Sequence, residues 1–248
     1  MSFKETKIYK WYDNFWNHYK WIAIVVSIFA VFIIVSTVQL AIKEDGDIYV
    51  MYAGPAVINV QKATYIERAF ENIDDNDYSG DGKVNAVLRD LTIMSADEIK
   101  AAAEDEMEEM GVPNEGYNIN EQMVNAHMSD SMRTFNQEIL GGDSVICLLS
   151  PYMYSIVRES DGFLPLEDAL GYMPENTYDE CALYLTDTDF GQLEGLSILP
   201  HDTLLCIRRI SSMSFLKGQS KTGKAYEYHL EKFRGAVNYV KAVENTEN

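Results

Sequence analysis

An uncharged run of 22 residues near the N-terminus constrains this chain more than any other feature. The run is WIAIVVSIFAVFIIVSTVQLAI, residues 21–42, and its clearly polar members are Ser27, Ser36, Thr37 and Gln39. A helix of that length, rising about 1.5 Å per residue, spans a hydrocarbon core of about 30 Å. A buried helix of a soluble protein is disfavoured because the run has no polar face. We therefore predict one transmembrane helix over residues 21–42.

A cleaved signal peptide is the alternative interpretation of the same run. Its apolar region would be shorter, and small residues would precede the cleavage site. Gln39 and Ala41 occupy the key positions before Ile42, and no cysteine follows closely enough for a lipoprotein anchor. The sequence favours an uncleaved anchor.

The charges on either side of the run predict its orientation. Residues 1–20 carry four lysines against two acidic residues, whereas the run is followed by KEDGD. By the positive-inside rule the N-terminus is cytoplasmic and the large C-terminal part is extracellular. Residues 1–20 also hold Trp11 and Trp16, and Trp21 opens the run. We interpret residues 1–20 as a basic, aromatic juxtamembrane segment at the inner leaflet.

The remainder of the chain is strongly acidic. Residues 43–248 hold 16 basic and 37 acidic residues, because 20 and 39 in total leave these after the first 42 are subtracted. The resulting net charge of −21 repels nucleic acid and anionic lipid, so both are excluded as partners of this part.

Apolar, β-prone runs alternate with segments of helical periodicity along residues 46–243. The predicted strands are 47–52, 84–94, 144–150, 181–186 and 203–210, and the predicted helices are 57–73, 97–109, 120–140 and a C-terminal helix. Ser95 to Glu98 reads as a capping box that begins the second helix. Apolar strands alternating with helices predict one α/β sandwich domain with a mostly parallel sheet covered on both faces.

Three cysteines, Cys147, Cys181 and Cys206, all lie in the apolar strand-like runs. An odd number leaves at least one thiol unpaired in an exported chain. We interpret all three as small buried hydrophobic residues, and a Cys181–Cys206 bridge stays open.

Three stretches resemble a known family. They are DIYVMYAGP, QEILGGDSVICLLSPYMYSIV and GFLPLED, and together they resemble the first lobe of type II extracellular solute-binding proteins over residues 46–210. Members of that family insert a second lobe after this region and clamp the ligand between the lobes. Here residues 171–180 alone separate the last stretch from the next predicted strand. The chain departs from the family pattern here, because these residues leave no room for a second lobe of ordinary size. We therefore expect a single lobe and no clamp between two lobes.

Ligands of open α/β sheets bind beyond the carboxyl ends of the strands. The loops there supply the candidate ligand-binding residues, which are Gly54, Pro55, Ser150, Tyr152, Asp187 and Asp189. Gly54 and Pro55 lead toward a helix N-terminus, which could accept an anionic group. The alternative is that these are three ordinary loops.

The stretch DDNDYSGDGKVN, residues 74–85, resembles half of a calcium loop. Its candidate ligands for Ca²⁺ are Asp77, Ser79, Asp81 and the carbonyl of Lys83, whereas Leu88 stands where a bidentate glutamate should close the loop. Either this loop holds a structural Ca²⁺ weakly or it is a hydrated turn between a helix and a strand.

The sequence offers no convincing catalytic signature. SFLK at 214–217 and KTG at 221–223 match serine acyl-enzyme motifs, but they lie within one short loop and are interpreted as chance. We therefore expect a non-enzymatic, membrane-anchored extracellular binding or interaction module. The alternatives are an accessory subunit that docks into a membrane complex through its helix and, less favoured, a cell-surface hydrolase.

Overall fold

The computed structural model describes residues 7–42, 46–101, 104, 121–210 and 219–240. The chain divides into two compact units at residues 45 and 46. The first unit contains helix α1 (Lys7–Ile42), 36 residues long. Within the described ranges it is the one helix long and apolar enough to cross a membrane, over His18–Ser36. It begins well before the predicted span because residues 7–20 contain neither glycine nor proline to interrupt it.

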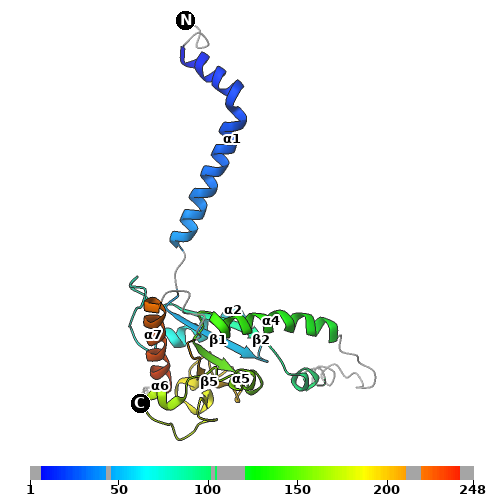
Figure 1. The fold of residues 1–248 in the computed structure, drawn as a ribbon, viewed down its shortest axis with the longest axis vertical. Coiled ribbons are helices and arrows are strands. Elements are labelled where there is room, and N and C mark those ends of the chain that lie inside the picture. Colours follow the sequence, from blue (N-terminus) through cyan, green and yellow to red (C-terminus); the bar gives the residue numbers. More distant parts are fainter. Residues whose placement is uncertain (1–6, 43–45, 102–103, 105–120, 211–218, 241–248) are drawn as a thin grey trace, which may run out of the picture. The chain divides into compact units, whose positions relative to one another are not determined.

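The second unit is an α/β domain around a five-stranded sheet (Figure 1). The strand order is β2-β1-β3-β5-β4. The strands are β1 (Ile48–Gly54), β2 (Ala86–Thr92), β3 (Ile146–Leu149), β4 (Ala182–Tyr184) and β5 (Leu204–Ile207). Each predicted strand is therefore present, and the α/β class is confirmed.

The sheet is mixed, whereas a mostly parallel sheet was expected. β1 pairs in parallel with both β2 and β3, but β5 runs antiparallel to both β3 and β4. A parallel neighbour needs a crossover of a dozen or more residues, usually a helix. The connection between β4 and β5 contains only the short 3₁₀ turns η2 (Leu185–Asp187) and η3 (Phe190–Gln192), so the chain turns back at the same edge.

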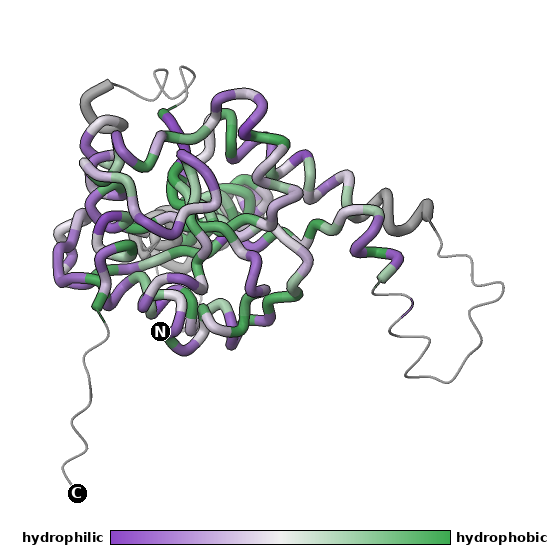
Figure 2. Tube along the Cα trace, turned by 90° about the horizontal axis from the view of Figure 1, so that it is seen from below, coloured by the Kyte–Doolittle hydropathy of each residue, from purple (hydrophilic) through white to green (hydrophobic). Residues whose placement is uncertain are grey.

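Helices cover both faces of the sheet, as predicted. One face packs against α2 (Val60–Glu71), α6 (Leu166–Leu170) and α7 (Gln219–Val237). The other packs against α4 (Glu121–Gly141) and α5 (Pro151–Arg158). Figure 2 shows the hydrophobic residues gathered in the middle of the domain and hydrophilic ones toward its outside. A helix also follows the capping box, in which Ser95 N donates to Glu98 at 2.5 Å and Glu98 N donates to Ser95 at 3.2 Å; residues 105–109 of the predicted helix lie outside the described ranges.

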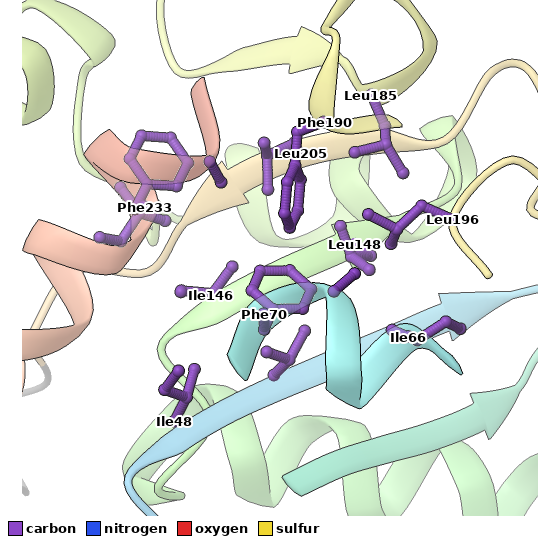
Figure 3. Packing of buried hydrophobic residues seen from close by; sticks show 14 of the residues in the cluster. Ile48, Ile66, Phe70, Ile146, Leu148, Leu185, Phe190, Leu196, Leu205 and Phe233 are labelled. Atoms are coloured by element: carbon purple, nitrogen blue, oxygen red, sulfur yellow. The ribbon is translucent and has the colours of Figure 1, made fainter. Parts of the chain in front are cut away.

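The α2–α7 face holds the larger part of the core (Figure 3). Phe70 of α2 meets Phe190 of η3 edge to face, with ring centroids 5.0 Å apart. Phe233 of α7 is fully buried beside them. The helical spacing of Ala63, Ile66, Phe70 and Ile73 predicts an apolar stripe on α2, and that of Tyr226, Leu230, Phe233, Val237 and Val240 predicts one on the C-terminal helix. Both stripes are confirmed, except that Val240 is exposed and Tyr239 packs against the core in its place.

The opposite face buries all three cysteines. Cys147 of β3 lies opposite Cys206 of β5 in the register, and Cys181 immediately precedes β4. All three are free thiols in the interior, among Met153, Phe163 and their neighbours. The prediction that they act as buried hydrophobic residues is confirmed.

The β2 edge of the sheet is closed by side chains of α2. Glu71 Oε1 accepts from the Ala86 N–H at 3.1 Å, and Glu67 Oε1 accepts from the Leu88 N–H at 3.0 Å. Two carboxylates one helical turn apart therefore stand where the carbonyl groups of another strand would lie. Charged residues that occupy an edge in this way oppose pairing with a second chain.

A buried arginine holds the connection between α4 and β3. Arg208 follows β5 and is almost fully buried. Its guanidinium donates to the carbonyls of Ile139 at 3.0 Å, Gly142 at 2.9 Å and Ser144 at 3.0 Å. The last carbonyls of a helix lack intrahelical partners and carry the negative end of the helix dipole. Arg208 satisfies these groups and is itself stabilised by them.

Replacing Arg208 with methionine is expected to lower the free energy of unfolding by about 2–4 kcal/mol, because one buried and two partly buried carbonyls lose their donor. The matched control is Arg89→Met, which removes an arginine whose side chain is half exposed in a 2.9 Å ion pair with Glu138. That change is expected to cost about 0–1 kcal/mol. Denaturant unfolding of the full chain in detergent compares the two, and equal losses would contradict the role given to Arg208.

Candidate functional site

The strand order changes direction at β1. From β1 the chain passes to β2 on one side, and from β2 it passes to β3 on the other side. Loops leaving the carboxyl ends of β1 and β3 therefore diverge, and this is where open α/β sheets hold ligands. Gly54 and Pro55 leave β1 at this point, and Ser150 and Tyr152 leave β3. The structure brings Gly54 and Ser150 together, since a Cβ on Gly54 would lie 3.4 Å from the Ser150 Cβ. Pro55 and Tyr152 follow them in the two loops.

The backbone of this site is closely packed. Ser150 N donates to the Ala53 carbonyl at 2.9 Å, and the Ser150 side chain caps α5 by accepting from Met153 N at 3.4 Å. Tyr52 Oη accepts from Ala56 N at 2.9 Å. A Cβ added to Gly54 would lie 2.7 Å from Tyr52 Oη. Glycine is therefore required where β1 ends, because a side chain would displace the phenol that holds the next loop.

The carboxylates of Asp202 and Glu98 act on Tyr52 at this site. Burial is the main cause that raises the pKa of Tyr52 to about 12; the Ala56 N–H lowers the pKa, and the two carboxylates contribute to its rise. The expected anion-accepting helix N-terminus is also absent next to Pro55, since α2 begins only at Val60 and is capped by Asn59. A neutral or cationic group suits this edge better.

Asp187 and Asp189 lie apart from the other candidates. They follow the carboxyl end of β4, on the same side of the domain as the carboxyl ends of β1 and β3. However, β5 lies between β3 and β4 in the sheet. Strands lie about 4.8 Å apart, so two spacings separate β4 from β3. Thr203 precedes β5 and lies between them. Thr203 and Asp202 were missed because the direction of β5 cannot be read from its apolar sequence. Tyr52 was missed because it lies inside the apolar run of β1, and its contact with Ala56 N has no sequence signal. Tyr152 is 40% exposed at the start of α5.

The aspartate loop, residues 74–85, lies between α2 and β2, at the amino ends of the parallel strands. It folds around its own carboxylates. Asp77 Oδ1 accepts from Gly80 N at 2.7 Å and from the Ser79 hydroxyl at 3.0 Å, and Oδ2 accepts from Gly82 N at 2.6 Å. Asp81 Oδ1 accepts from Lys83 N at 2.9 Å. The N–H groups of Gly82 and Gly80 lower the pKa of Asp77.

Buried charged residues from outside the loop help to fix its position. Asp47, buried just before β1, accepts from Ser79 N at 2.7 Å and from Asn85 N at 2.9 Å. Lys232 of α7 is fully buried and donates to Asp74 Oδ1 at 2.6 Å. The Lys232 ammonium also lies 5.0 Å from the centre of the Tyr228 ring.

These contacts make the loop a closed turn. Both carboxylate oxygens of Asp77 already accept backbone N–H groups, which is how aspartate stabilises a turn without an ion. Within the described part of the chain, no group of three histidine, cysteine, aspartate or glutamate side chains is arranged to hold a metal. Calcium binding by Asp77, Ser79, Asp81 and the Lys83 carbonyl stays a prediction.

No family model, curated protein or solved structure matches this chain. The fold and the local geometry therefore carry the functional argument alone.

Substituting Gly54 with alanine is expected to cost about 1–3 kcal/mol of stability, because the new Cβ meets Tyr52 Oη. Adding Tyr52→Phe removes that oxygen, so the double variant should be no less stable than Tyr52→Phe alone. Gly223→Ala is the control, since a Cβ there meets nothing within 4 Å inside α7. Thermal unfolding measures all four proteins, and purely additive losses would contradict the proposed clash.

Proposed function

We propose that this protein is a membrane-anchored extracellular binding module shaped like one lobe of a solute-binding protein. α1 crosses the membrane with its N-terminus in the cytoplasm, and the α/β domain lies outside. A solute or protein ligand binds at the carboxyl ends of β1 and β3. No second lobe closes over the site, so the ligand is held on one surface.

The convergence of Gly54 and Ser150 at the change in strand order supports this proposal most directly. Three features give this edge the character of a binding surface: the close backbone approach at Gly54, the helix cap at Ser150 and the half-exposed ring of Tyr152. Polar groups that fix orientation beside exposed aromatic surface are typical of small-molecule sites. The nearby Asp202 and Glu98 direct the choice toward ligands that are not anionic.

A panel of solutes tests the binding function. The full chain in detergent is heated with amino acids, sugars, polyamines or short peptides, and separately with calcium or a chelator. A ligand at 100 times its Kd stabilises the folded state by about 2.7 kcal/mol, which raises Tm by several degrees. We expect a neutral or cationic solute to produce that shift and anionic solutes to produce none.

Tyr152→Ala localises the effect. It should abolish the shift, whereas Tyr172→Ala should retain it, because Tyr172 is equally exposed but contacts Asn238 beyond α7. A Tm that no solute alters would contradict the solute-binding proposal. A shift with calcium alone that is lost in Asp81→Asn would assign the ion to residues 74–85.

A role as an accessory subunit of a membrane complex is the second candidate function. It is favoured by the aromatic surface of α1, where Phe15 and Tyr19 stack with ring centroids 5.6 Å apart and Trp16 and Trp21 are exposed. Such residues suit the interface of a membrane or a partner helix.

Replacement of residues 21–42 by an unrelated apolar helix, together with leucine at Phe15, Trp16 and Tyr19, tests this second function. A docking subunit should lose its co-purifying partners while remaining in the membrane, because the specific helix surface is gone. A chain with residues 21–42 intact and Tyr152→Ala serves as the control. Partners that co-purify equally well with the replaced span would rule out docking through α1.

A further inference from the structure

His229 of α7 is buried against the beginning of β1. Its Nε2 lies 2.9 Å from the Tyr49 amide nitrogen, and its Nδ1 lies 2.6 Å from the Ala225 carbonyl oxygen. The ring also stacks on Tyr49, with ring centroids 6.1 Å apart and planes inclined by 25°. The side chain thus occupies the place of a hydrogen-bonding neighbour for a β1 amide.

The two contacts fix the protonation state of the ring. A carbonyl oxygen can only accept, so Nδ1 carries the proton and donates to Ala225. A backbone amide can only donate, so Nε2 must present its lone pair to Tyr49. The neutral ring satisfies both partners, whereas the imidazolium would direct a second N–H at the N–H of Tyr49.

Charged residues from three other parts of the domain act on His229. Arg208, after β5, opposes a positive ring, whereas Asp143, before β3, and Asp47, before β1, favour one. Burial has the largest effect and lowers the pKa of His229 below its usual value near 6.5. The neighbouring Tyr228 ring lies nearly perpendicular to His229, and the Lys232–Asp74 ion pair follows one turn later in α7.

We propose that His229 is an acid-sensitive latch that fastens α7 to strand β1. At neutral pH the Nε2 lone pair holds the Tyr49 amide and α7 stays closed on the sheet. Protonation of Nε2 removes the acceptor, places a charge beside Arg208 and releases this contact. α7 then moves away from the face of the sheet on which it packs.

The release reaches the aspartate loop because α7 also holds that loop. Tyr228, adjacent to His229, donates its hydroxyl to the Asn76 carbonyl at 2.6 Å, and Lys232 holds Asp74. A displacement of α7 breaks both contacts. Acid is therefore expected to loosen residues 74–85 together with α7. The candidate site at the carboxyl ends of β1 and β3 is expected to stay in place.

The direction of the pH effect follows from the lowered pKa. The folded state binds fewer protons than the open state below pH 6.5, so closure is fully stabilised above 6.5 and loses that stabilisation as pH falls through the lowered pKa. Within that window each pH unit raises the open fraction by up to tenfold.

Hydrogen exchange of the full chain in detergent, corrected for the intrinsic pH dependence of exchange, tests the latch. In the wild-type protein, protection of α7 and residues 74–85 should fall together between pH 6.5 and 4.5, by up to tenfold per unit. In His229→Gln, whose side-chain oxygen can replace Nε2 as acceptor but does not titrate, protection should persist through that range. In His229→Phe, which has no acceptor, both segments should already exchange faster at pH 7.5.

Asp74→Asn separates the latch from the neighbouring ion pair. It removes the carboxylate that Lys232 holds, yet the change between pH 6.5 and 4.5 should remain because His229 is intact. An unchanged acid response in His229→Gln would overturn the proposal, as would its disappearance in Asp74→Asn. So would wild-type protection that is constant across this range.

Discussion

Strand β1 has hydrogen-bonded neighbours on both sides, and the rest of the domain is positioned relative to it. Side chains complete its backbone at each end: His229 accepts from Tyr49 N at the start, and Tyr52 Oη accepts from Ala56 N just beyond the end. Unpaired backbone groups in the interior cost about as much as a lost hydrogen bond, so these two side chains allow β1 to be buried at six of its seven positions.

The two ends of the parallel strands β1 and β3 have different physical characters. Where β1 begins, buried charged and polar groups connect separate elements: Asp47 fixes the aspartate loop, Arg208 closes α4, and Lys232 pairs with Asp74. Breaking a buried pair on one side leaves an uncompensated charge, which makes such links specific. Where β1 and β3 end, close backbone approach and partly exposed side chains prevail instead. The amino ends of the strands organise the fold, and the carboxyl ends carry the proposed ligand site.

The positions of strands and helices could be predicted because each one carries its own pattern. The apolar run of β3 and the capping box at Ser95 are local signals, and both are confirmed. The direction of β5 could not be predicted, because the apolar run TLLCIRRI fits either orientation and its pairing depends on how the connection from β4 turns the chain back. The same limit applies to the site: Gly54 and Ser150 meet as expected, whereas Asp187 is separated from them by β5. His229, Arg208 and Lys232 have no sequence signal beyond being polar residues beside apolar ones, because their partners lie 64 to 180 positions away in the chain.

Native-state hydrogen exchange of the β1 amides tests most directly whether α7 completes the central strand. At pH 7.5 the Tyr49 amide should exchange only through global unfolding, with the same protection as Val50 and Tyr52 in the middle of the strand. Exchange of Tyr49 at the rate of the exposed helix start at Val60, while Val50 stays protected, would show that His229 does not hold β1 and would contradict the account.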